Sequence, residues 1–327
     1  MKGPRVQGSK GPRVPGRWSK GPKVLTLVIT LSAVVFATSV RSKGPLDPIP
    51  GPSDLWTLGP LDRQSGPSRI ISLVPAVTEM LFAIGAGDQI VGVSSYEIYP
   101  PEAKKRPSMG ALFDPDVERI LAAKSDLVIV YGSQTELMSR LQRASVPMFR
   151  YEHAGLADIT STIRALGDRV GRGARAREVA TAIERDLDAI RQSVAGKPRP
   201  KTALLFGREP GALRNMYASG GVGFMHDMLE LVGGIDAFAD VKRQNLQATT
   251  EILLARAPEV IIEVHPAEGW TPERIVTERA VWKGLPSLPA VRTGRIHIIT
   301  DDRLIVPGPR VAEGAKLLAS VLHGSGR

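Results

Sequence analysis

The stretch RIISLVPAVTEMLFAIGAGDQIVGV, residues 69–93, indicates the fold class of the chain. A short apolar run is followed by Pro75, which suits the first turn of a helix. The helical segment extends to Gly85, and a second apolar run follows at 90–93. The predicted order is strand, helix, strand. Strands that alternate with helices are typical of a parallel sheet covered by helices on both faces.

The alternation continues along the chain, with one long helical segment in the middle. Residues 158–194 carry apolar side chains mostly three or four positions apart, which predicts one long helix, bent or interrupted near Gly167, Gly171 and Gly173. Further strands are expected at 126–131, 146–150, 202–206, 260–264 and 296–299, and further helices at 116–123, 135–144, 223–232, 250–255, 271–278 and 309–322.

This pattern predicts an α/β fold of two Rossmann-like lobes joined by one long helix. The amino-terminal lobe, the connecting helix and the carboxyl-terminal lobe are expected at 69–156, 157–196 and 197–327.

The amino terminus has the layout of an export signal. Residues 24–40, VLTLVITLSAVVFATSV, are uncharged, follow only basic residues and end in small side chains. These 17 residues also just suffice to cross a bilayer as an uncleaved anchor. We therefore expect a periplasmic protein with a basic leader and signal at 1–43 and a Pro- and Gly-rich linker at 44–68. Tethering to the inner membrane through 24–40 is the alternative.

Charge and cysteine content exclude several classes of function. The formal charge is +10, but nine of the 43 Lys and Arg residues precede Asp47, the first acidic residue. The rest of the chain carries 34 basic and 33 acidic side chains. A nucleic-acid partner is not expected, because the foldable part lacks the excess positive charge that neutralises phosphates. The absence of Cys excludes disulfides, thiolate metal clusters and a cysteine nucleophile.

Five segments, in order, resemble one known family. They are RIISLVPAVTEMLFAIGAGDQIVGVSSYEIYPPEA (69–103), DVERILAAKSDLVIV (116–130), GVGFMHDMLELVGG (221–234), TTEILLARAPEVII (249–262) and PGPRVAEGAKLLA (307–319). They are similar to periplasmic substrate-binding proteins of ABC importers that carry cobalamin, haem or iron siderophores, and most closely to the cobalamin binders. The resemblance implies a rigid connecting helix, a ligand in the cleft between the lobes, and a permease dimer with its ATPase as partners.

The resemblance also implies ligand contacts in both lobes. Tyr96, in SSYEIYPP, matches a tyrosine that faces the corrin ring, and a planar aromatic buries much area with few rotatable bonds. Asp302, in TDDRLIVPGPR, matches an acidic residue near the ligand. Asp301 can substitute for it, and either can instead cap a helix. The tryptophans of cobalamin binders are missing before the DVERI and TTEIL helices, which leaves Phe113 as the nearby aromatic.

Basic and imidazole side chains form a second group of candidates. His265 and His153 each follow a predicted strand, where α/β sheets place ligand sites, and an imidazole there can coordinate cobalt or haem iron. A plain loop histidine is the alternative for both. No resident metal ion is expected, because two scattered histidines do not supply three or four converging ligands. Four basic residues in loops of the second lobe can pair with carboxylates of haem or of an acidic siderophore, or simply be solvated: Arg208, Arg214, Lys242 and Arg243.

Glu118 and Glu251 occupy equivalent places, one near the start of a helix in each lobe. The resemblance implies that each docks onto arginines of one permease subunit. A glutamate at a helix start is also favoured by the helix dipole without any partner, which is the alternative interpretation.

These features favour a monomeric, non-catalytic receptor that captures a corrinoid outside the cytoplasmic membrane and delivers it to an ABC importer. Haem or a ferric siderophore is the alternative cargo. No catalytic cofactor is expected, since the bound chelate is the cargo. An enzyme on the same frame is a rival hypothesis, although GxSxG, GxGxxG after a strand, and GxxxxGK[ST] are all absent. A tethered interaction module with a vestigial cleft is a further hypothesis that the missing tryptophans leave open.

Overall fold

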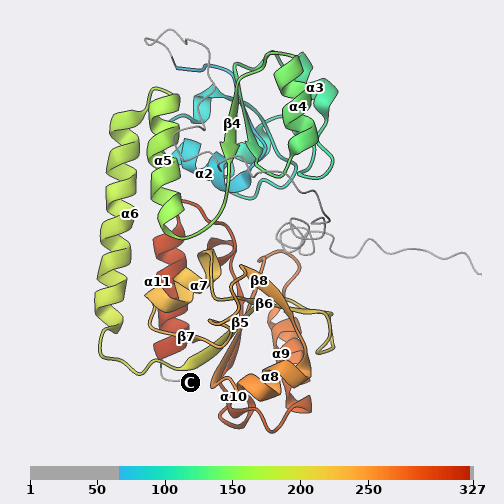
Figure 1. Ribbon diagram of the computed structural model, residues 1–327, viewed down its shortest axis with the longest axis vertical. Helices are drawn as coiled ribbons and strands as arrows, with labels where there is room; N and C mark the ends of the chain where they lie inside the picture. The colour runs from blue at the N-terminus through green and yellow to red at the C-terminus, as the bar shows by residue number, and fades with distance from the viewer. Residues whose placement is uncertain (1–65, 325–327) are drawn as a thin grey trace, which may run out of the picture.

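The structure, a computed structural model, describes residues 66–324, which form two α/β lobes that lie one above the other in Figure 1. The leader, the candidate signal or anchor at 24–40 and the expected linker up to residue 65 lie outside the described residues. Within the described part, no helix combines the length and the apolar character needed to cross a bilayer.

The first lobe is built on a four-stranded parallel sheet in the order β2-β1-β3-β4. The central strands read IIS and LVIVY and are almost wholly buried, as a parallel sheet covered on both faces requires. The strands are β1 (Ile70–Ser72), β2 (Ile90–Val93), β3 (Leu127–Tyr131) and β4 (Met148–Tyr151). The lobe also contains the helices α2 (Pro75–Ala83), α3 (Val117–Ala122) and α4 (Thr135–Arg143), with the 3-10 turns η2 (Gly87–Gln89) and η3 (Ala103–Lys105).

Helix α2 enters the body of the lobe soon after β1. Pro75 lies in its first turn, where the missing N–H is not needed. Residues 76–81 are all buried, and they include the acidic side chain of Glu79. Just beyond the helix, Gly85 has a φ of +76°, which glycine adopts without steric cost. The buried carboxyl of Glu79 requires a partner from elsewhere in the fold.

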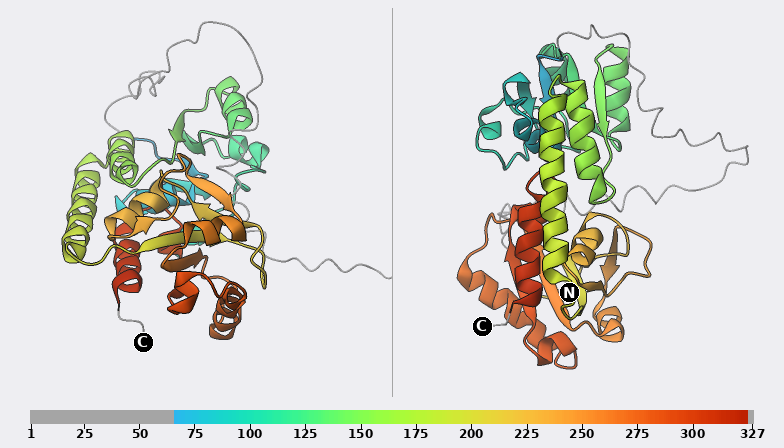
Figure 2. Two further views of the ribbon diagram at one scale, coloured as in Figure 1. Left: turned by 60° about the horizontal axis from the view of Figure 1, so that its bottom comes forward. Right: turned by 90° about the vertical axis from the view of Figure 1, so that its left-hand side faces the viewer.

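The segment 157–196, expected as one connecting helix, folds as two helices packed side by side, α5 (Ala157–Arg169) and α6 (Gly173–Val194). The chain reverses at Gly171, whose φ is +72°. A Cβ on Gly167 would lie 2.1 Å from the Cβ of Ala176, so the glycine permits the close approach of the two helices. Only the 22 residues of α6, about 33 Å long at helical rise, run alongside both lobes (Figure 2).

The second lobe has a mixed sheet in the order β10-β9-β5-β6-β8, with β7 paired to β5. Strands β10, β9, β5 and β7 are parallel, whereas β6 and β8 add an antiparallel edge. Its strands are β5 (Lys201–Gly207), β6 (Met216–Ser219), β7 (Ile235–Asp236), β8 (Asn245–Ala248), β9 (Val260–His265) and β10 (Ile296–Thr300). Its helices are α7 (Phe224–Leu231), α8 (Thr250–Arg256), α9 (Pro272–Ala280), α10 (Pro289–Arg292) and α11 (Val311–His323), with the 3-10 turns η4 (Val281–Gly284) and η5 (Asp302–Leu304).

The antiparallel edge of the second lobe consists of two strands that the sequence analysis did not predict. Strands β6 and β8 have four residues each and read MYAS and NLQA. Neither is an apolar run of the kind that marks a buried parallel strand, so the sequence carries little signal for them. They are recruited by pairing onto β5 and onto each other.

The parallel strands of the two lobes direct their carboxyl ends toward each other. After β4, the backbone N–H of Leu156 donates to Asp227 Oδ2 of α7 at 2.8 Å, and the carbonyl of His153 accepts from Gln244 Nε2 at 3.0 Å. One apolar cluster contains residues of the first sheet, of α6 and of α11, so the lobes share a core. The segments that follow these strands therefore meet between the lobes, where α/β folds place ligand sites.

Candidate functional site

Tyr96 and Asp302, predicted as ligand contacts from opposite lobes, both lie at the facing strand ends. Tyr96 follows β2, is half-buried, and donates its backbone N–H to Ser94 Oγ at 3.1 Å. Asp302 opens η5 just after β10, is half-buried, and accepts from the N–H of Ala267 at 3.3 Å through Oδ1. Asp301 is the residue that caps η5, and its carboxylate is also paired with Arg303. Asp302 thus keeps a second carboxylate oxygen to which no hydrogen bond is assigned.

An ion pair between the lobes lies beside these residues. Arg310 Nε donates to Glu79 Oε2 at 2.9 Å and its Nη2 donates to Oε1 at 2.6 Å, a bidentate arrangement. The side chains are 18% and 3% exposed. The guanidinium also lies 4.0 Å from the ring centre of Tyr99, in the same segment as Tyr96. Burial raises the pKa of Glu79, although Arg310 opposes the shift. The sequence analysis did not identify this pair, because its members are 231 residues apart.

Glu97, between Tyr96 and Tyr99, is a buried carboxyl with an incomplete set of partners. Its Oε1 accepts from Thr78 Oγ1 at 2.9 Å, whereas its buried Oε2 has no partner in the described part of the chain. Burial, with a smaller contribution from the charge of Glu79, raises the pKa of Glu97 to about 8 despite the Thr78 bond. Glu97 is therefore mostly protonated at pH 7.

Aromatic and imidazole groups also lie at the ends of β3 and β4, beside the lobe interface. The rings of Tyr131 and Tyr151 meet edge to face at 5.7 Å, and Tyr151 stacks on His153 at 6.4 Å. His153 in turn contacts Phe224 of the second lobe at 5.6 Å. Burial lowers the pKa of His153 to about 4 and raises that of Tyr131 to about 12, so both are neutral at pH 7. His153, which the sequence analysis offered as a possible metal ligand, is a neutral imidazole packed between Tyr151 and Phe224.

Arg208, expected as a loop cation that pairs with the ligand, is buried within the second lobe. Its side chain is only 2% exposed and pairs with two glutamates, Glu263 at 3.1 Å and Glu278 at 2.8 Å. The remaining donors bond to the carbonyls of Glu209, Ala212 and Glu278. The expectation that Arg208 pairs with the ligand is corrected for a physical reason. Glu263 of β9 and Glu278 of α9 pair with its guanidinium and neutralise its charge.

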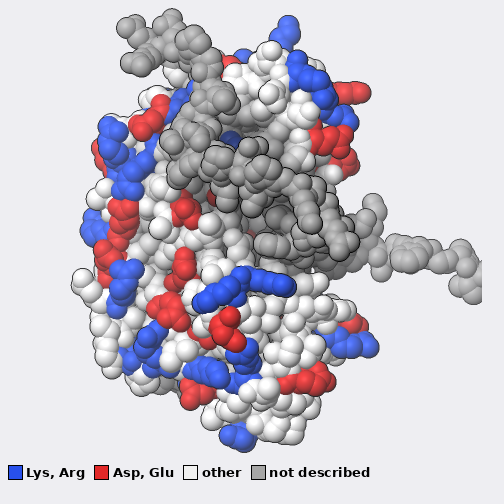
Figure 3. Space-filling view, in the orientation of Figure 1, with Lys and Arg blue, Asp and Glu red and all other residues white. Residues whose placement is uncertain are grey.

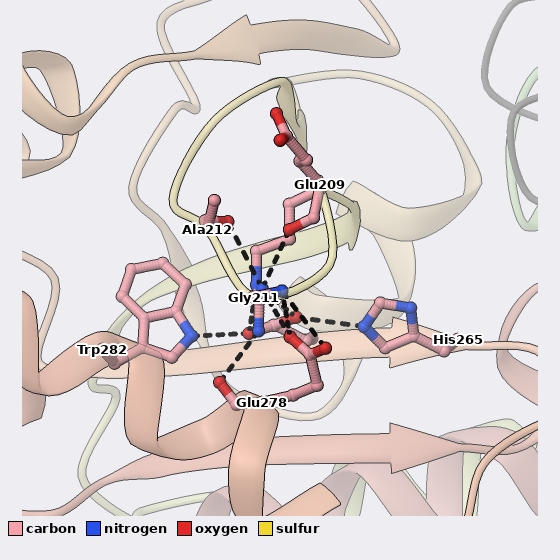
Figure 4. Close-up of polar contacts among 8 residues, drawn as sticks. Glu209, Gly211, Ala212, His265, Glu278 and Trp282 are labelled. Carbon is pink, nitrogen blue, oxygen red and sulfur yellow. Dashed lines mark hydrogen bonds and ion pairs between the residues drawn. The ribbon is translucent and has the colours of Figure 1, made fainter. Parts of the chain in front are cut away.

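His265, expected in a loop, is the last residue of β9 and belongs to the same buried cluster (Figure 4). Its Nε2 lies 3.0 Å from Glu263 Oε2, and its buried Nδ1 has no partner. Although burial opposes ionisation of Glu263, the bond from His265 and the charge of Arg208 hold the pKa of Glu263 below its ordinary value. Trp270 covers the imidazole, with ring centres 4.2 Å apart. His265 is only 3% exposed beside this indole.

Trp270 was not singled out by the sequence analysis, although it follows β9 closely. Arg274 lies 4.3 Å from the centre of its ring, so the indole packs between an imidazole and a guanidinium. Phe113 differs, because its side chain is 51% exposed and extends from the turn between Gly110 and Pro115. A tryptophan just past a predicted strand was the signal that could have found Trp270.

No group of three or more His, Asp and Glu side chains within residues 66–324 is arranged to hold a metal ion. On the face of the molecule in Figure 3, acidic and basic side chains are interspersed. The site between the lobes thus contains aromatic rings, neutral polar groups, the carboxylate of Asp302 and the Glu79–Arg310 pair.

Residues 70–303 match the family model of the periplasmic binding protein. The chain belongs to this family. The match covers most of the described residues and confirms the resemblance seen in the five sequence segments.

Relatives of this binding protein include a vitamin B12-binding protein of Salmonella typhimurium, 30% identical over 256 residues that cover 78% of this chain and 90% of that protein. One from Pectobacterium carotovorum is 27% identical over 258 residues, with coverage of 78% and 88%. The haem-binding protein RhuT of Roseiflexus superposes with a TM-score of 0.67 at 26% identity, covering 79% of this chain and 98% of that one. The periplasmic vitamin B12 binding protein of Vibrio cholerae has the same fold, with a TM-score of 0.67 at 23% identity and coverage of 79% and 97%.

Replacing Arg208 with Met is expected to destabilise the binding protein by about 3–5 kcal/mol, because Glu263 and Glu278 would remain buried without a cation. Urea unfolding measures the loss. Arg214→Met is the matched control, since Arg214 makes an exposed pair with Glu209 and its loss should cost at most about 1 kcal/mol. A variant of Arg208 that keeps wild-type stability and loses only ligand affinity would return Arg208 to the ligand contacts.

The pair between the lobes is expected to show strong energetic coupling. In a double-mutant cycle of Glu79→Gln and Arg310→Met, we predict a coupling of about 1–3 kcal/mol in the free energy of unfolding, because one partner is nearly fully buried. Additive effects of the two substitutions would show that the pair does not hold the lobes together.

Proposed function

We propose that this periplasmic binding protein is exported, captures a corrinoid and presents it to the permease of an ABC importer. The observation that carries the proposal is the match to vitamin B12-binding proteins over 88–90% of their length. It is supported by the position of Tyr96 and Asp302 at facing strand ends, since a ligand that bridges the lobes can touch both. Export through residues 24–40 is part of the proposal.

The chemistry of the facing edges suits a large, flat ligand with amide side arms. Tyr96 and the exposed ring of Phe113 offer apolar faces from the first lobe. Asp302 offers a carboxylate acceptor from the second lobe, which can receive N–H groups of amides. The neutral Tyr131, Tyr151 and His153 form a wall that is polar without being charged.

Haem is the alternative cargo, because structural neighbours include haem-binding proteins. The carboxylates of haem are usually bound by cationic side chains. Arg208, however, is paired with two glutamates, and Arg214 pairs with Glu209 at 2.7 Å. His265 lies beneath Trp270, and His153 is packed against Phe224. The feature that favours haem is Tyr99, an exposed phenol beside Arg310, since a tyrosine can ligate haem iron.

Equilibrium titration with cyanocobalamin, hemin and a panel of ferric siderophores tests the cargo. We expect saturable binding of cyanocobalamin, weakened about tenfold or more in each of Tyr96→Ala and Asp302→Ala, which remove contacts from opposite lobes. Ligand absorbance and protein fluorescence follow the binding, and Glu178→Gln on α6 is the control. Binding of hemin alone would replace the corrinoid and keep the receptor class. Chemical change of a ligand during incubation would favour an enzyme, and no binding by any ligand would favour a module with a vestigial cleft.

For the permease we propose two docking patches, one on each lobe. Glu118 lies in the first turn of α3 and Glu251 in the first turn of α8, and both are exposed. One turn further, α3 presents Leu121 and α8 presents Leu254, each 39% exposed. Both helices lie on the side of the molecule away from α6 (Figure 1). An acid beside an apolar side chain, repeated in the two lobes, fits a pair of identical subunits that each offer a cation next to an apolar surface.

Charge reversal tests the docking patches. The double variant Glu118→Lys/Glu251→Lys is expected to bind a vitamin B12 permease–ATPase complex in nanodiscs at least about tenfold more weakly, because each lobe would present a repelling charge. Cyanocobalamin affinity should not change. Glu136→Lys on α4, where Glu136 is exposed and paired with Arg140, is the matched control. Equal association of the double variant and the control would remove these glutamates from the interface.

A further inference from the structure

The segment 94–99 carries one side chain inward between two that face outward. Glu97 is 9% exposed, whereas Tyr99 is 42% exposed and Tyr96 is half-buried. Tyr99 stacks against Arg310 of the second lobe, and Tyr96 is the proposed cargo contact. The segment thus directs the acidic side chain of Glu97 into the first lobe, at a position between Tyr96 and Tyr99 in the sequence.

The inward carboxyl is attached to α2 by one bond. Thr78 Oγ1 lies 2.9 Å from Glu97 Oε1, a bond that a neutral carboxyl can make in either direction. Thr78 continues to Ser72 Oγ at 2.8 Å and to the carbonyl of Val74 at 3.2 Å. The chain of bonds therefore links segment 94–99 to the end of β1 and the start of α2, the rigid centre of the lobe. Glu97 Oε2 is buried and has no hydrogen-bond partner among residues 66–324.

The surroundings of this carboxyl offer no free positive charge among the described residues. Glu79 faces it from α2, and Tyr131 faces it from β3. The Arg310 guanidinium is directed at Glu79 through Nε and Nη2, and the further acid near that pair is Asp302. Ionisation of Glu97 would place a second negative charge beside Glu79 in a largely buried site. Such a charge is costly in the folded state and is relieved if the segment moves outward.

We propose that Glu97 is a positioning residue that, in its neutral form, anchors segment 94–99 and so holds Tyr96 against the cargo. The inference deepens the proposed function, because it makes cargo binding dependent on a proton at a residue that does not itself touch the cargo. The carboxyl holds its proton up to about pH 8, which is the pKa that burial gives it. Above that pH the segment is released, and with it both Tyr96 and the contact of Tyr99 with Arg310.

Two measurements on the intact chain test this inference between pH 6.5 and 9.5. The affinity for cyanocobalamin in wild type is expected to be about tenfold lower at pH 9 than at pH 7, following the ionised fraction of a group with a pKa of about 8. Hydrogen exchange of segment 94–99, corrected for the intrinsic pH dependence of amides, should lose protection over the same range.

The variants separate positioning from simple packing. Glu97→Gln keeps a neutral side chain that can bond to Thr78, so it should retain wild-type affinity at pH 7 and keep that affinity at pH 9. Glu97→Val has no bond to Thr78 and should bind more weakly at every pH, with no step near pH 8. Glu102→Gln, at an exposed carboxyl shortly after the segment, is the control and should behave as wild type.

The possible results are distinguishable from failure of the proposed cargo. If cyanocobalamin does not bind but protection of 94–99 falls near pH 8 only where Glu97 is present, the corrinoid assignment fails and the positioning role stands. If cyanocobalamin binds with affinity and protection that do not change between pH 7 and 9 in wild type, the positioning role is overturned. An identical step near pH 8 in Glu97→Gln would also overturn it.

Discussion

The buried carboxylate of Glu79 on α2 needs hydrogen-bond donors and a positive charge, and the second lobe provides both. Arg310 supplies both hydrogen bonds, and the guanidinium also covers the ring of Tyr99. The bidentate contact fixes orientation as well as distance, because the planar fork of Arg matches the two carboxylate oxygens. Together with the apolar cluster that runs from the first sheet through α6 to α11, this contact sets how the carboxyl ends of the two sheets face each other. Every proposed cargo contact depends on that geometry.

The basic side chains near the site mostly form ion pairs within the protein itself. Arg208 pairs with Glu263 and Glu278, Arg303 pairs with Asp301, and Arg310 pairs with Glu79. The groups left for a ligand are aromatic faces, a free carboxylate oxygen on Asp302 and neutral polar side chains. This distribution favours a ligand recognised by shape and by amide hydrogen bonds over one recognised by its own charges. The tryptophans expected before α3 and α8 are missing, but Phe113 in the turn before α3 and Trp270 after β9 offer aromatic surface.

The proposed anchoring role of Glu97 and the contact between the lobes have a common basis. Both place an acid in the interior of the first lobe, and the two acids differ in outcome because one has a cation and the other does not. Glu79 has its cation in Arg310, whereas Glu97 has only a hydroxyl and remains neutral near pH 7. A single residue in the other lobe therefore gives one of two neighbouring carboxyls a counter-charge that the other lacks.

The sequence by itself determined the elements and their order. The apolar runs at 70–72, 127–131 and 260–265 are the central strands, and helices α2, α4 and α8 begin within a residue or two of their predicted starts. These features are local, because periodicity and turn residues depend on neighbours a few positions away. Tyr96 and Asp302 were singled out by the family resemblance, and their role as ligand contacts stays a prediction.

Only the tertiary structure decided what the charged and buried side chains do. Whether Arg208 is a ligand contact or an internal counter-ion depends on Glu263 and Glu278, which lie 55 and 70 residues further along the chain. The pairing of Glu79 with Arg310 spans 231 residues, and the weak strands exist through pairing, β6 with β5 and β8 with β6. Interactions of this kind are set by which elements pack together, and the residues flanking each partner carry no trace of them.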